Sequence, residues 1–489
     1  MVDVLTTEQM RQTEQRAFAG GVDSLLLMED AARGIFDRLS QTFSPLQGKT
    51  FIILCGPGNN GGDGVAVGRL LKNAGASVRL FCDGAKSPQL QTNLDYFTAL
   101  GGEIQPLSDA ASLFIFADVI IDALYGTGFR GQLDEQSAAL SVAAKRAHKP
   151  VWSIDIPSGL NGDTGRHEGC CFHADVTLCL GYPKAGLLLS PCRDFIGQLQ
   201  LIPLCLPEKA QNSPLKLLEK SDLTFNKRPV NCHKGLAGRV AIFAGSFGMA
   251  GAAAMAAKAA LKAGAGLVTV LAERSLNPIL QTLVPNAMCR DIDRDEVPEH
   301  DVLIAGCGIG QGQTAGDRLR RLLAAEQGPV ILDADGLNLL AQDPFPLPPE
   351  TILTPHIGEA ARLLGTTPRH VSVNKLSAAR EILTKYGASC VVLKSDVTLI
   401  ADSSGALINA LGSPSLSKGG SGDALCGIIA ALIAEEQAVQ KPLTLLAARG
   451  CMWLGLAGEE AENRFGDRCA LTGDVLNLLP AVWQKIVSN

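Results

Sequence analysis

Short apolar runs alternate with helical stretches along the first half of the chain, and this alternation constrains the fold more than any other feature. The runs are rich in β-branched residues and have the length of single strands: Phe51–Cys55, Val78–Phe81, Val119–Asp122 and Val151–Ile154. Helical stretches lie between or before them: Thr7 to Leu39, Val65–Ala74, Leu90–Leu100 and Ser137–Ala147. Apolar strands joined by helices form a parallel sheet with both faces covered. We therefore predict a Rossmann-like parallel-sheet domain.

A second α/β domain is predicted in the other half, because 489 residues exceed one ordinary core. Its expected strands are again short apolar runs: Arg239–Ala244, Leu267–Leu271, Asp301–Ala305, Pro329–Leu332, Thr351–Thr354 and Cys390–Leu393. A helix is expected at Ala250–Lys262, and the chain from Gly420 onward is mostly helical in pattern. A polar stretch, 204–226, carries Pro207 and Pro214 and is predicted to be a linker. The expected domains are residues 1–215 and 226–489.

Composition excludes several classes of protein. Hydrophobic residues make up 46% and charged residues 19%, as in globular proteins, and the net charge of −6 gives no support for nucleic-acid binding. The polar N-terminus is no secretory signal, and glycines interrupt the uncharged stretch Val240–Ala257, which therefore indicates a buried loop and helix rather than a membrane span. The 14 cysteines are scattered without a CxxC pair, which indicates reduced thiols and no structural zinc site. We expect a cytoplasmic protein.

Polar, glycine-rich loops follow three of the predicted strands in the first half. They are Gly56–Gly64 (GPGNNGGDG), the loop from Asp122 to Gly131, and Asp155–Gly159 (DIPSG). In open parallel sheets, ligands bind beyond the carboxyl ends of strands. Successive backbone N–H groups and a helix expected to start at Gly64 would attract phosphates, and two such loops suit a dinucleotide. The alternative is that these loops are tight turns and their carboxylates are helix caps.

These motifs, taken together, resemble the epimerase domain of the NAD(P)H-hydrate repair enzymes over roughly residues 1 to 215. That family interconverts the R and S hydrates of NADH and NADPH (NADHX and NADPHX). The resemblance implies potassium ligands at Asn60, Asp122 and Ser158, whose oxygen donors suit a hard cation. It also implies contacts to the hydrate, chiefly to its phosphates, from Asn59, Asn60, Gly61, Gly62, Asp63, Gly126, Thr127, Gly128, Phe129, Arg130, Gly131, Gln132 and Asp155.

Asp155 lies at the reacting carbon if the resemblance holds. We hypothesise that it acts as acid and base on the C6 hydroxyl of the hydrate. The alternative is a structural role, in which Asp155 orients Ser158 or the turn at Pro157.

The strongest local motif in the second half is Lys418-Gly-Gly-Ser-Gly-Asp423, ahead of a predicted helix at Ala424–Ala434. Backbone N–H groups of Gly420–Gly422 would form an anion hole, and Asp423 would serve as a base beside a transferring phosphoryl group. A helix N-cap is the alternative role for Asp423, although a cap alone needs no row of glycines.

Further polar clusters follow other strands of the second half. The loop Gly306–Gly310 is glycine-rich, Asp333 and Asp335 form a carboxylate pair, and His356 precedes an expected helix. The two carboxylates either bind magnesium or cap a helix. A single histidine at a helix start is more often a hydrogen-bonded cap than a ligand contact.

The second half resembles the ribokinase-like superfamily and, more narrowly, the ADP-dependent NAD(P)H-hydrate dehydratase, over roughly residues 226 to 489. Its motifs are TPHIGEAARLL, DADGLN and GGSGD. The implied reaction converts the S hydrate and ADP into NAD(P)H, AMP and phosphate with Mg²⁺, because phosphorylation turns the C6 hydroxyl into a good leaving group. The implied hydrate contacts are Ala252, Gly310, His356 and Asp423. The implied ADP contacts are Lys394, Ser395, Asp396, Val397, Thr398 and Gly422, although the family usually has glycine where this chain has Ser395.

Two other functions remain open from the sequence. The second half alone also fits a vitamin or sugar-alcohol kinase that uses ATP with Asp423 as base. The first half also fits a binding or scaffold module, although Asn60, Asp122, Asp155 and Ser158 are all present. The partners expected for the whole chain are NADHX or NADPHX and ADP, with no nucleic acid or membrane, in a homo-oligomer.

Overall fold

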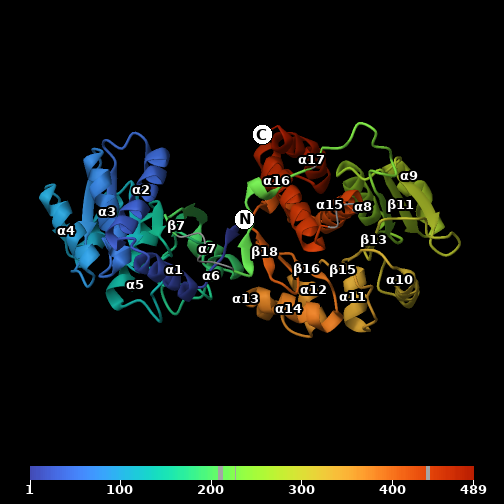
Figure 1. Ribbon diagram of the computed structural model, residues 1–489, viewed down its shortest axis with the longest axis horizontal. Coiled ribbons are helices and arrows are strands. Elements are labelled where there is room, and N and C mark those ends of the chain that lie inside the picture. The colour runs from blue at the N-terminus through green and yellow to red at the C-terminus, as the bar shows by residue number, and fades with distance from the viewer. Residues whose placement is uncertain (207–212, 226, 437–440, 489) are drawn as a thin grey trace. The chain divides into compact units, whose positions relative to one another are not determined.

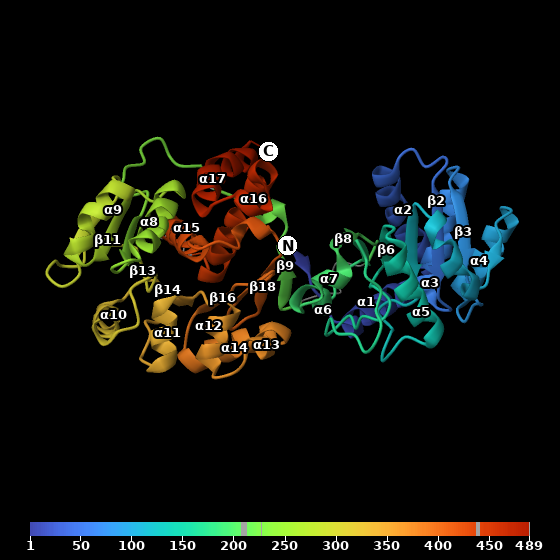
Figure 2. The ribbon, with the colours of Figure 1, turned by 180° about the vertical axis from the view of Figure 1, so that it is seen from behind.

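The computed structural model describes residues 1–206, 213–225, 227–436 and 441–488. The chain forms two compact units. One is Val2–Ser213, and the other is Pro214–Asn489 together with Met1. Both are α/β structures (Figures 1 and 2). The predicted linker, 204–226, lies partly outside the described residues, and its described part holds a strand, β9 (Leu215–Leu217). In the described ranges, no helix has the length and apolar character that a membrane crossing requires.

The sheet of the first unit is parallel throughout, as predicted, with the order β4-β3-β2-β5-β6-β7-β8. Its strands are β2 (Thr50–Cys55), β3 (Ser77–Phe81), β4 (Ile104–Gln105), β5 (Val119–Ala123), β6 (Val151–Ile154), β7 (Val176–Leu180) and β8 (Gln198–Ile202), and a short β1 (Val2–Asp3) precedes them in the chain. The sequence analysis did not predict β4, β7 or β8. Since β7 lies beside β6, the polar edge of this sheet is wider than expected.

Helices cover both faces of this sheet. They are α1 (Thr7–Ala19), α2 (Ser24–Phe43), α3 (Asn59–Asn73), α4 (Pro88–Ala99), the 3₁₀ helix η1 (Leu107–Phe116), α5 (Glu135–Ala147), α6 (Ala185–Leu189) and α7 (Arg193–Ile196). Apolar residues of α2, α3 and α4 pack on one face around Phe51 and Ile53. Residues of η1 and α5 pack on the other face around Ile52 and Leu54. Alternate residues of β2 therefore contribute to two separate cores.

The predicted helical segment from Thr7 to Leu39 is two helices rather than one. Gly20 ends α1, and the following Gly21 has a φ of 95°, a left-handed conformation that favours glycine. The Asp23 carboxylate then caps α2 by accepting hydrogen bonds from the backbone N–H groups of Leu25 and Leu26.

The second unit has a mixed sheet, in which β9-β18-β17-β16-β15-β14-β13-β10-β11-β12 lie side by side in this order. The strands are β10 (Arg239–Phe243), β11 (Leu267–Ala272), β12 (Met288–Asp291), β13 (Val302–Ala305), β14 (Val330–Leu332), β15 (Thr351–Leu353), β16 (Cys390–Leu393), β17 (Thr398–Ala401) and β18 (Ala406–Asn409). From β12 to β16 the strands are parallel, whereas β17 is antiparallel to both neighbours. The sequence analysis missed β12, β17 and β18.

Helices cover this sheet too. The elements are α8 (Ala250–Lys262), α9 (Asn277–Leu283), α10 (Gln313–Ala325), α11 (Asp335–Gln342), α12 (Ile357–Leu364), α13 (Pro368–Val373), α14 (Lys375–Tyr386), α15 (Ser421–Glu436), α16 (Leu443–Cys469), α17 (Thr472–Val487) and the 3₁₀ turns η3 (Lys220–Asp222), η4 (Arg274–Leu276) and η5 (Pro414–Leu416). Helices α8, α15, α16 and α17 share one alanine-rich core, and α10 to α14 lie across the strands from them in Figure 1. The helical C-terminal region predicted from Gly420 onward is confirmed by α15, α16 and α17.

Candidate active sites

A pocket of about 970 Å³ opens at the carboxyl ends of β2, β5 and β6 in the first unit. Helix α1 forms another of its walls. Most of the predicted hydrate contacts line it: Asn59, Asn60, Asp63, Gly126, Thr127, Gly128, Phe129, Arg130, Gln132 and Asp155. The structure thus brings together three loops that are far apart in the sequence, as expected for a parallel sheet.

Asp155 follows β6 and faces this pocket. Its φ of 67° is unusual for a residue other than glycine and costs on the order of 1–3 kcal/mol. One carboxylate oxygen, Oδ1, lies 2.6 Å from Nζ of Lys184, and the other, Oδ2, accepts a hydrogen bond of 3.2 Å from the backbone N–H of Thr127. Ser158 makes its hydrogen bonds to Asp122 instead. The alternative that Asp155 orients Ser158 is therefore not what the structure shows.

Lys184 is a site residue that the sequence analysis missed. Its side chain is 1% exposed, and Nζ also donates to the backbone carbonyl of Leu180 at 2.8 Å. Burial alone would lower its pKa, but the Asp155 carboxylate outweighs burial and raises the pKa of Lys184. Lys184 follows β7 as Asp155 follows β6, so recognising β7 as a strand would have pointed to it.

Two further carboxyl groups of the pocket, those of Glu14 and Asp63, have raised pKa values. Burial, together with the charge of Asp155, raises the pKa of Glu14 on α1 to about 7. Burial also raises the pKa of Asp63 on α3, with the charges of Asp155 and Glu14 adding to the effect. The pocket therefore holds one carboxylate paired with lysine and two carboxyl groups whose pKa values are raised, as suits proton transfer.

Of the predicted potassium ligands, Asn60 lines this pocket, whereas Asp122 and Ser158 are buried and do not line it. Asp122 is fully buried and accepts hydrogen bonds from Ser158 Oγ at 2.6 Å and from Ser153 Oγ at 2.8 Å. Within the described residues, no lysine or arginine forms an ion pair with Asp122. The buried Nδ2 atom of Asn60 has no hydrogen-bond partner in the described part of the chain. A buried carboxyl group with no basic partner among the described residues is compatible with a cation site, whereas the unpartnered Asn60 Nδ2 is a donor and cannot bind a cation itself.

The GPGNNGGDG loop differs from its prediction in one respect. Helix α3 begins at Asn59 rather than at Gly64, so the two asparagines lie in its first turn. Gly61 and Gly62 are buried within the protein. A Cβ atom at Gly61 would lie 1.9 Å from the carbonyl oxygen of Gly56, and a Cβ atom at Gly62 would lie 2.6 Å from the Cε atom of Met28. These two glycines, like Gly131, do not line the pocket. Glycine is required at both positions because α3 packs closely there, at Gly61 against the loop after β2 and at Gly62 against α2 and α4.

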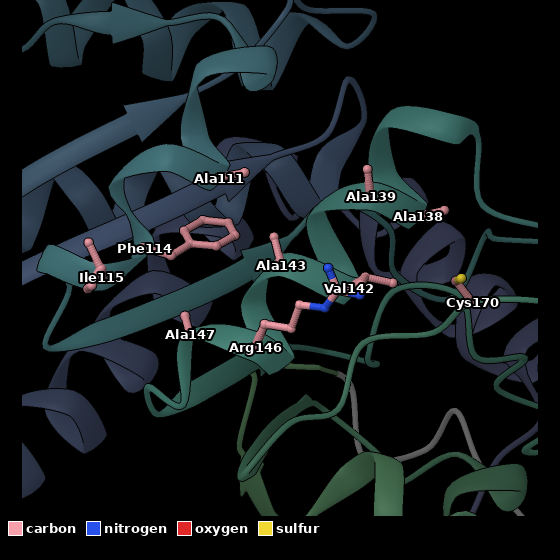
Figure 3. Close-up of a pocket in the computed structure, with 10 residues that line it drawn as sticks. All are labelled: Ala111, Phe114, Ile115, Ala138, Ala139, Val142, Ala143, Arg146, Ala147 and Cys170. Carbon is pink, nitrogen blue, oxygen red and sulfur yellow. The ribbon is translucent and has the colours of Figure 1, made fainter.

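A second hollow of the first unit contains none of the predicted site residues. It is an apolar groove of about 600 Å³ between η1 and α5, where Phe114, Ile115 and Val142 line it and Arg146 is its charged side chain (Figure 3). It has no arrangement of polar groups that would recognise a nucleotide. We therefore place the substrate site in the larger, polar pocket.

In the second unit, three predicted site residues, Asp333, Lys394 and Gly422, converge where parallel strands end. Nζ of Lys394, which follows β16, lies 2.8 Å from Oδ1 of Asp333, which follows β14. A Cβ atom at Gly422 would lie 3.1 Å from that Nζ and 3.2 Å from Oδ2 of Asp333. Although burial opposes ionisation, the Lys394 ammonium lowers the pKa of Asp333. The glycine-rich start of α15 thus lies against a buried ion pair.

Asp423 lies in the first turn of α15, which begins at Ser421, two residues before it and earlier than predicted. It is therefore not the residue that precedes the helix, so the N-cap alternative is not supported. Burial raises the pKa of Asp423, and the negative charge of Asp333 adds to this effect. Asp423 remains partly exposed. These are the properties of a carboxylate base beside a helix N-terminus.

The predicted hydrate contacts Ala252 and Gly310 lie on neighbouring loops. A Cβ atom at Gly308 would lie 3.0 Å from the Cβ atom of Ala252, so α8 and the loop after β13 are in contact. The carboxylate of Asp335 accepts a hydrogen bond of 2.9 Å from the Gly310 N–H and another from Gln311 Nε2. Asp335 thus holds the loop of Gly310.

His356 is the N-cap of α12. Its Nδ1 accepts hydrogen bonds from the N–H groups of Gly358 and Glu359, and the Glu359 carboxylate accepts one from the His356 N–H. The side chain of His356 is nevertheless 54% exposed. The capping role considered from the sequence is present, and it leaves one face of the ring open to a ligand.

The predicted nucleotide loop, Lys394 to Thr398, connects β16 and β17. Val397 is 1% exposed and belongs to the core, so it offers a ligand its backbone alone. The hydroxyl of Ser395 donates to the Val397 carbonyl at 2.6 Å, and Asp396 pairs with the buried Lys375 at 2.6 Å. Ser395, where the family usually has glycine, is accommodated by a hydrogen bond within the turn.

Models of two protein families match the two halves of the chain. Residues 24–186 match the N-terminal region of YjeF-related proteins, and residues 240–480 match NAD(P)H-hydrate dehydratase. Among solved structures, a ribokinase-like superfamily protein from Enterococcus faecalis superimposes with a TM-score of 0.51 at 28% identity, covering 56% of this chain and 98% of its own. The ADP/ATP-dependent NAD(P)H-hydrate dehydratase of Bacillus subtilis gives a TM-score of 0.50 at 26% identity, covering 55% and 98%. The second unit is thus a ribokinase-like enzyme domain.

Full-length relatives contain both halves. The bifunctional NAD(P)H-hydrate repair enzyme of Moorella thermoacetica is 35% identical over 99% of this chain and 97% of its own length. That of Escherichia coli is 35% identical over 90% of this chain and 85% of its own. This chain belongs to the family of bifunctional NAD(P)H-hydrate repair enzymes, whose two activities are an epimerase and a dehydratase.

Proposed function

We propose that the two activities of the family are divided between the units of this chain, with epimerisation in residues 1–215 and dehydration in residues 226–489. The observation that carries the proposal is that each unit gathers its own predicted residues at the carboxyl edge of its own sheet. In the first unit these are Asn60, Asp63, Thr127 and Asp155, and in the second Asp333, Lys394, Gly422 and Asp423.

In the first unit, the pair of Asp155 and Lys184 provides the chemistry. The Asp155 carboxylate, 2.6 Å from the Lys184 ammonium, takes the proton of the C6 hydroxyl as the bond between C6 and the ring nitrogen opens, and closure of that bond on the other face inverts C6. Glu14 and Asp63, whose pKa values are raised, supply or accept the second proton that inversion at C6 requires. The loop from Gly126 to Gln132 and the first turn of α3 bind the phosphates.

Potassium is the cation that the family resemblance implies at Asn60, Asp122 and Ser158. Asp122 is a buried carboxylate whose described partners are hydroxyl and N–H groups, so its donor set fits a monovalent cation. The bound ion would neutralise Asp122 and attract the substrate's phosphates. Ser158 Oγ also accepts a hydrogen bond of 2.9 Å from the Tyr125 N–H, which links this site to the loop that faces the hydrate.

In the second unit, Asp423 takes the proton of the C6 hydroxyl as that oxygen receives the terminal phosphoryl group of ADP. Lys394 and the N–H groups at the start of α15 stabilise the charge on the phosphoryl oxygens. Mg²⁺ supplies further charge neutralisation when bound with the nucleotide, and the carboxylate oxygens of Asp335 suit it. The phosphorylated oxygen then leaves C6 as phosphate, and the neighbouring ring carbon C5 releases a proton to solvent as the double bond of NAD(P)H forms.

The direct test is to incubate the protein with mixed R and S hydrate, ADP, Mg²⁺ and K⁺, and to follow the recovery of nicotinamide absorbance. We expect both epimers to be consumed, with AMP and phosphate released in equal amounts. Replacing K⁺ with a bulky organic cation should slow the consumption of R hydrate and leave that of pure S hydrate unchanged. Consumption of the S epimer alone would refute the epimerase assignment.

A rival enzyme function for the second unit is a small-molecule kinase. Turnover of a hydroxymethylpyrimidine or a sugar with ATP, and none of the S hydrate with ADP, would establish that function. A cytoplasmic homo-oligomer with ADP preferred as donor remains part of the proposal. Size-exclusion chromatography with light scattering, and rates with ADP against ATP, test these two parts.

A further inference from the structure

Two buried thiols and a carboxylate meet beneath the dehydratase site. Cys307 follows β13, Asp333 follows β14, and Cys426 lies one turn beyond Asp423 on α15. One ligand atom from each of the three side chains lies within 4.8 Å of the others. The Sγ atom of Cys426 is 3.4 Å from Oδ2 of Asp333. Three neighbouring elements therefore bring together three atoms that can bind a metal.

The chemistry of these ligands selects a soft metal ion. Thiolate sulfur prefers ions such as Zn²⁺ and Cd²⁺, whereas Mg²⁺ requires oxygen ligands. The catalytic Mg²⁺ of the family would therefore not compete well here. A set of two sulfurs and one carboxylate oxygen leaves one position of a tetrahedral ion for water or for a fourth side chain.

Charge balance favours such an ion. With both thiols protonated, the cluster carries Asp333 and its partner Lys394, which neutralise each other. A divalent ion displaces the two thiol protons, which pass to the buffer, and two metal–sulfur bonds and one metal–oxygen bond form. The two positive charges of the ion then balance the two new thiolates, so the net charge of the buried site does not change.

The cluster is reached through the active site. Cys307, Asp333 and Cys426 are buried, whereas Asp423 is partly exposed and its carboxylate interacts with the Cys307 thiol. Asp423 therefore lies between the cluster and solvent and can act as the fourth ligand. An ion bound here would be coordinated by Asp423, which could then no longer act as the base.

We propose that Cys307, Cys426 and Asp333 form a binding site for a soft divalent cation, Zn²⁺ or Cd²⁺, which inhibits the dehydratase by taking Asp423 away from the reaction. The epimerase unit contains none of these ligands. It is therefore an internal control within the same chain.

The test titrates the reduced full-length protein with Cd²⁺, follows the thiolate-to-metal charge-transfer absorption, and measures both activities. We expect a tight binding step that requires both thiols, loss of dehydration with epimerisation retained, and recovery when a chelator removes the metal. Cys307→Ser and Cys426→Ala should each weaken binding by more than about 100-fold, the upper end for loss of an outer-shell partner. Cys469→Ser, which removes an exposed thiol, should change nothing.

Inhibition is scored against the metal-free activity of each variant, so a change in basal rate does not affect the result. The absorption readout is independent of whether Asp423 is the base, and thermal melting of each variant verifies its fold. The proposal is overturned if binding and inhibition survive in the double variant, or if Cd²⁺ inhibits both activities equally. A Cys307–Cys426 disulfide in the freshly purified protein that blocks Cd²⁺ binding would also overturn it.

Discussion

Each of the two sites contains a lysine–aspartate ion pair, but the pair has a different role in each site. In the first unit Lys184 pairs with Asp155, the proposed acid and base, at 2.6 Å. In the second unit Lys394 pairs at 2.8 Å with Asp333, a supporting carboxylate, and the proposed base Asp423 stands apart from the pair. Each site thus combines a lysine-bound carboxylate with a neighbouring carboxyl group whose pKa is raised.

The difference follows from the two reactions. Epimerisation needs proton transfer in both directions, which a carboxylate fixed at a lysine and an adjacent protonated carboxyl group provide together. Phosphoryl transfer needs stabilisation of charge and a single base. Under this proposal, Lys394 of the second unit stabilises the phosphoryl oxygens, and Asp423, whose pKa is raised, is the base for the hydroxyl.

The largest expected effect is that of Asp423→Ala. Loss of a general base should lower the rate of dehydration of pure S hydrate by about 10²–10⁴-fold. Epimerisation in the same protein should be unchanged, because Asp423 lies in the other unit. Phosphate release and R-to-S conversion are measured in parallel. Asp343→Asn, which removes an exposed surface carboxylate, is the matched control, and full phosphate release in Asp423→Ala would refute the base role.

A smaller but still large effect is expected from Lys184→Met. Removing one partner of a buried pair leaves an uncompensated charge and should destabilise the first unit by about 3–5 kcal/mol, with loss of epimerisation. Lys394→Met should cost more stability, because the carboxylate that it leaves unpaired, Asp333, is 3% exposed, whereas Asp155 is 10% exposed. Urea unfolding measures the free energy of unfolding of both lysine variants.

The double variant Lys184→Met with Asp155→Asn is the control for this comparison. Since it removes both charges, it should regain much of the stability and none of the activity. Equal costs for the two lysine variants would show that burial does not distinguish the pairs.

The smallest expected effect concerns pH. Glu14 has a pKa of about 7 in the folded protein against 4.5 as its ordinary value, so between these values the folded state keeps a proton that the unfolded state has lost. Stability therefore falls as pH rises through this window, by about 2–3 kcal/mol. Glu14→Gln cannot ionise and should lack this fall. Thermal melts of both proteins from pH 4.5 to 7.5 test the prediction, and parallel pH profiles would contradict it.

Much of both sites could be predicted, because polar residues at the ends of apolar strands are a local pattern. Asp122, Asp155 and Asp423 each stand in such a pattern, and the structure places them at the expected edges. Lys184 was missed because β7, the strand before it, was not recognised. The hairpin of β17 and β18 was missed as well.

Contacts between distant parts of the chain could not be predicted from the sequence. Cys307 and Cys426 show no metal-binding spacing, and only the packing of α15 against β13 brings them together. The raised pKa of Glu14 likewise depends on how α1 folds over the pocket. Burial and proximity of this kind arise from the tertiary fold, which local patterns do not encode.

The most direct test of the proposal that each unit carries one of the two activities is complementation on pure R hydrate with ADP. Asp155→Ala should fail because it makes no S hydrate, and Asp423→Ala should fail because it cannot dehydrate the S hydrate that it makes. A mixture of the two variants should restore the recovery of nicotinamide absorbance, since the S hydrate formed by one is consumed by the other. Recovery by either variant alone at the parental rate, or failure of the mixture, would contradict the account.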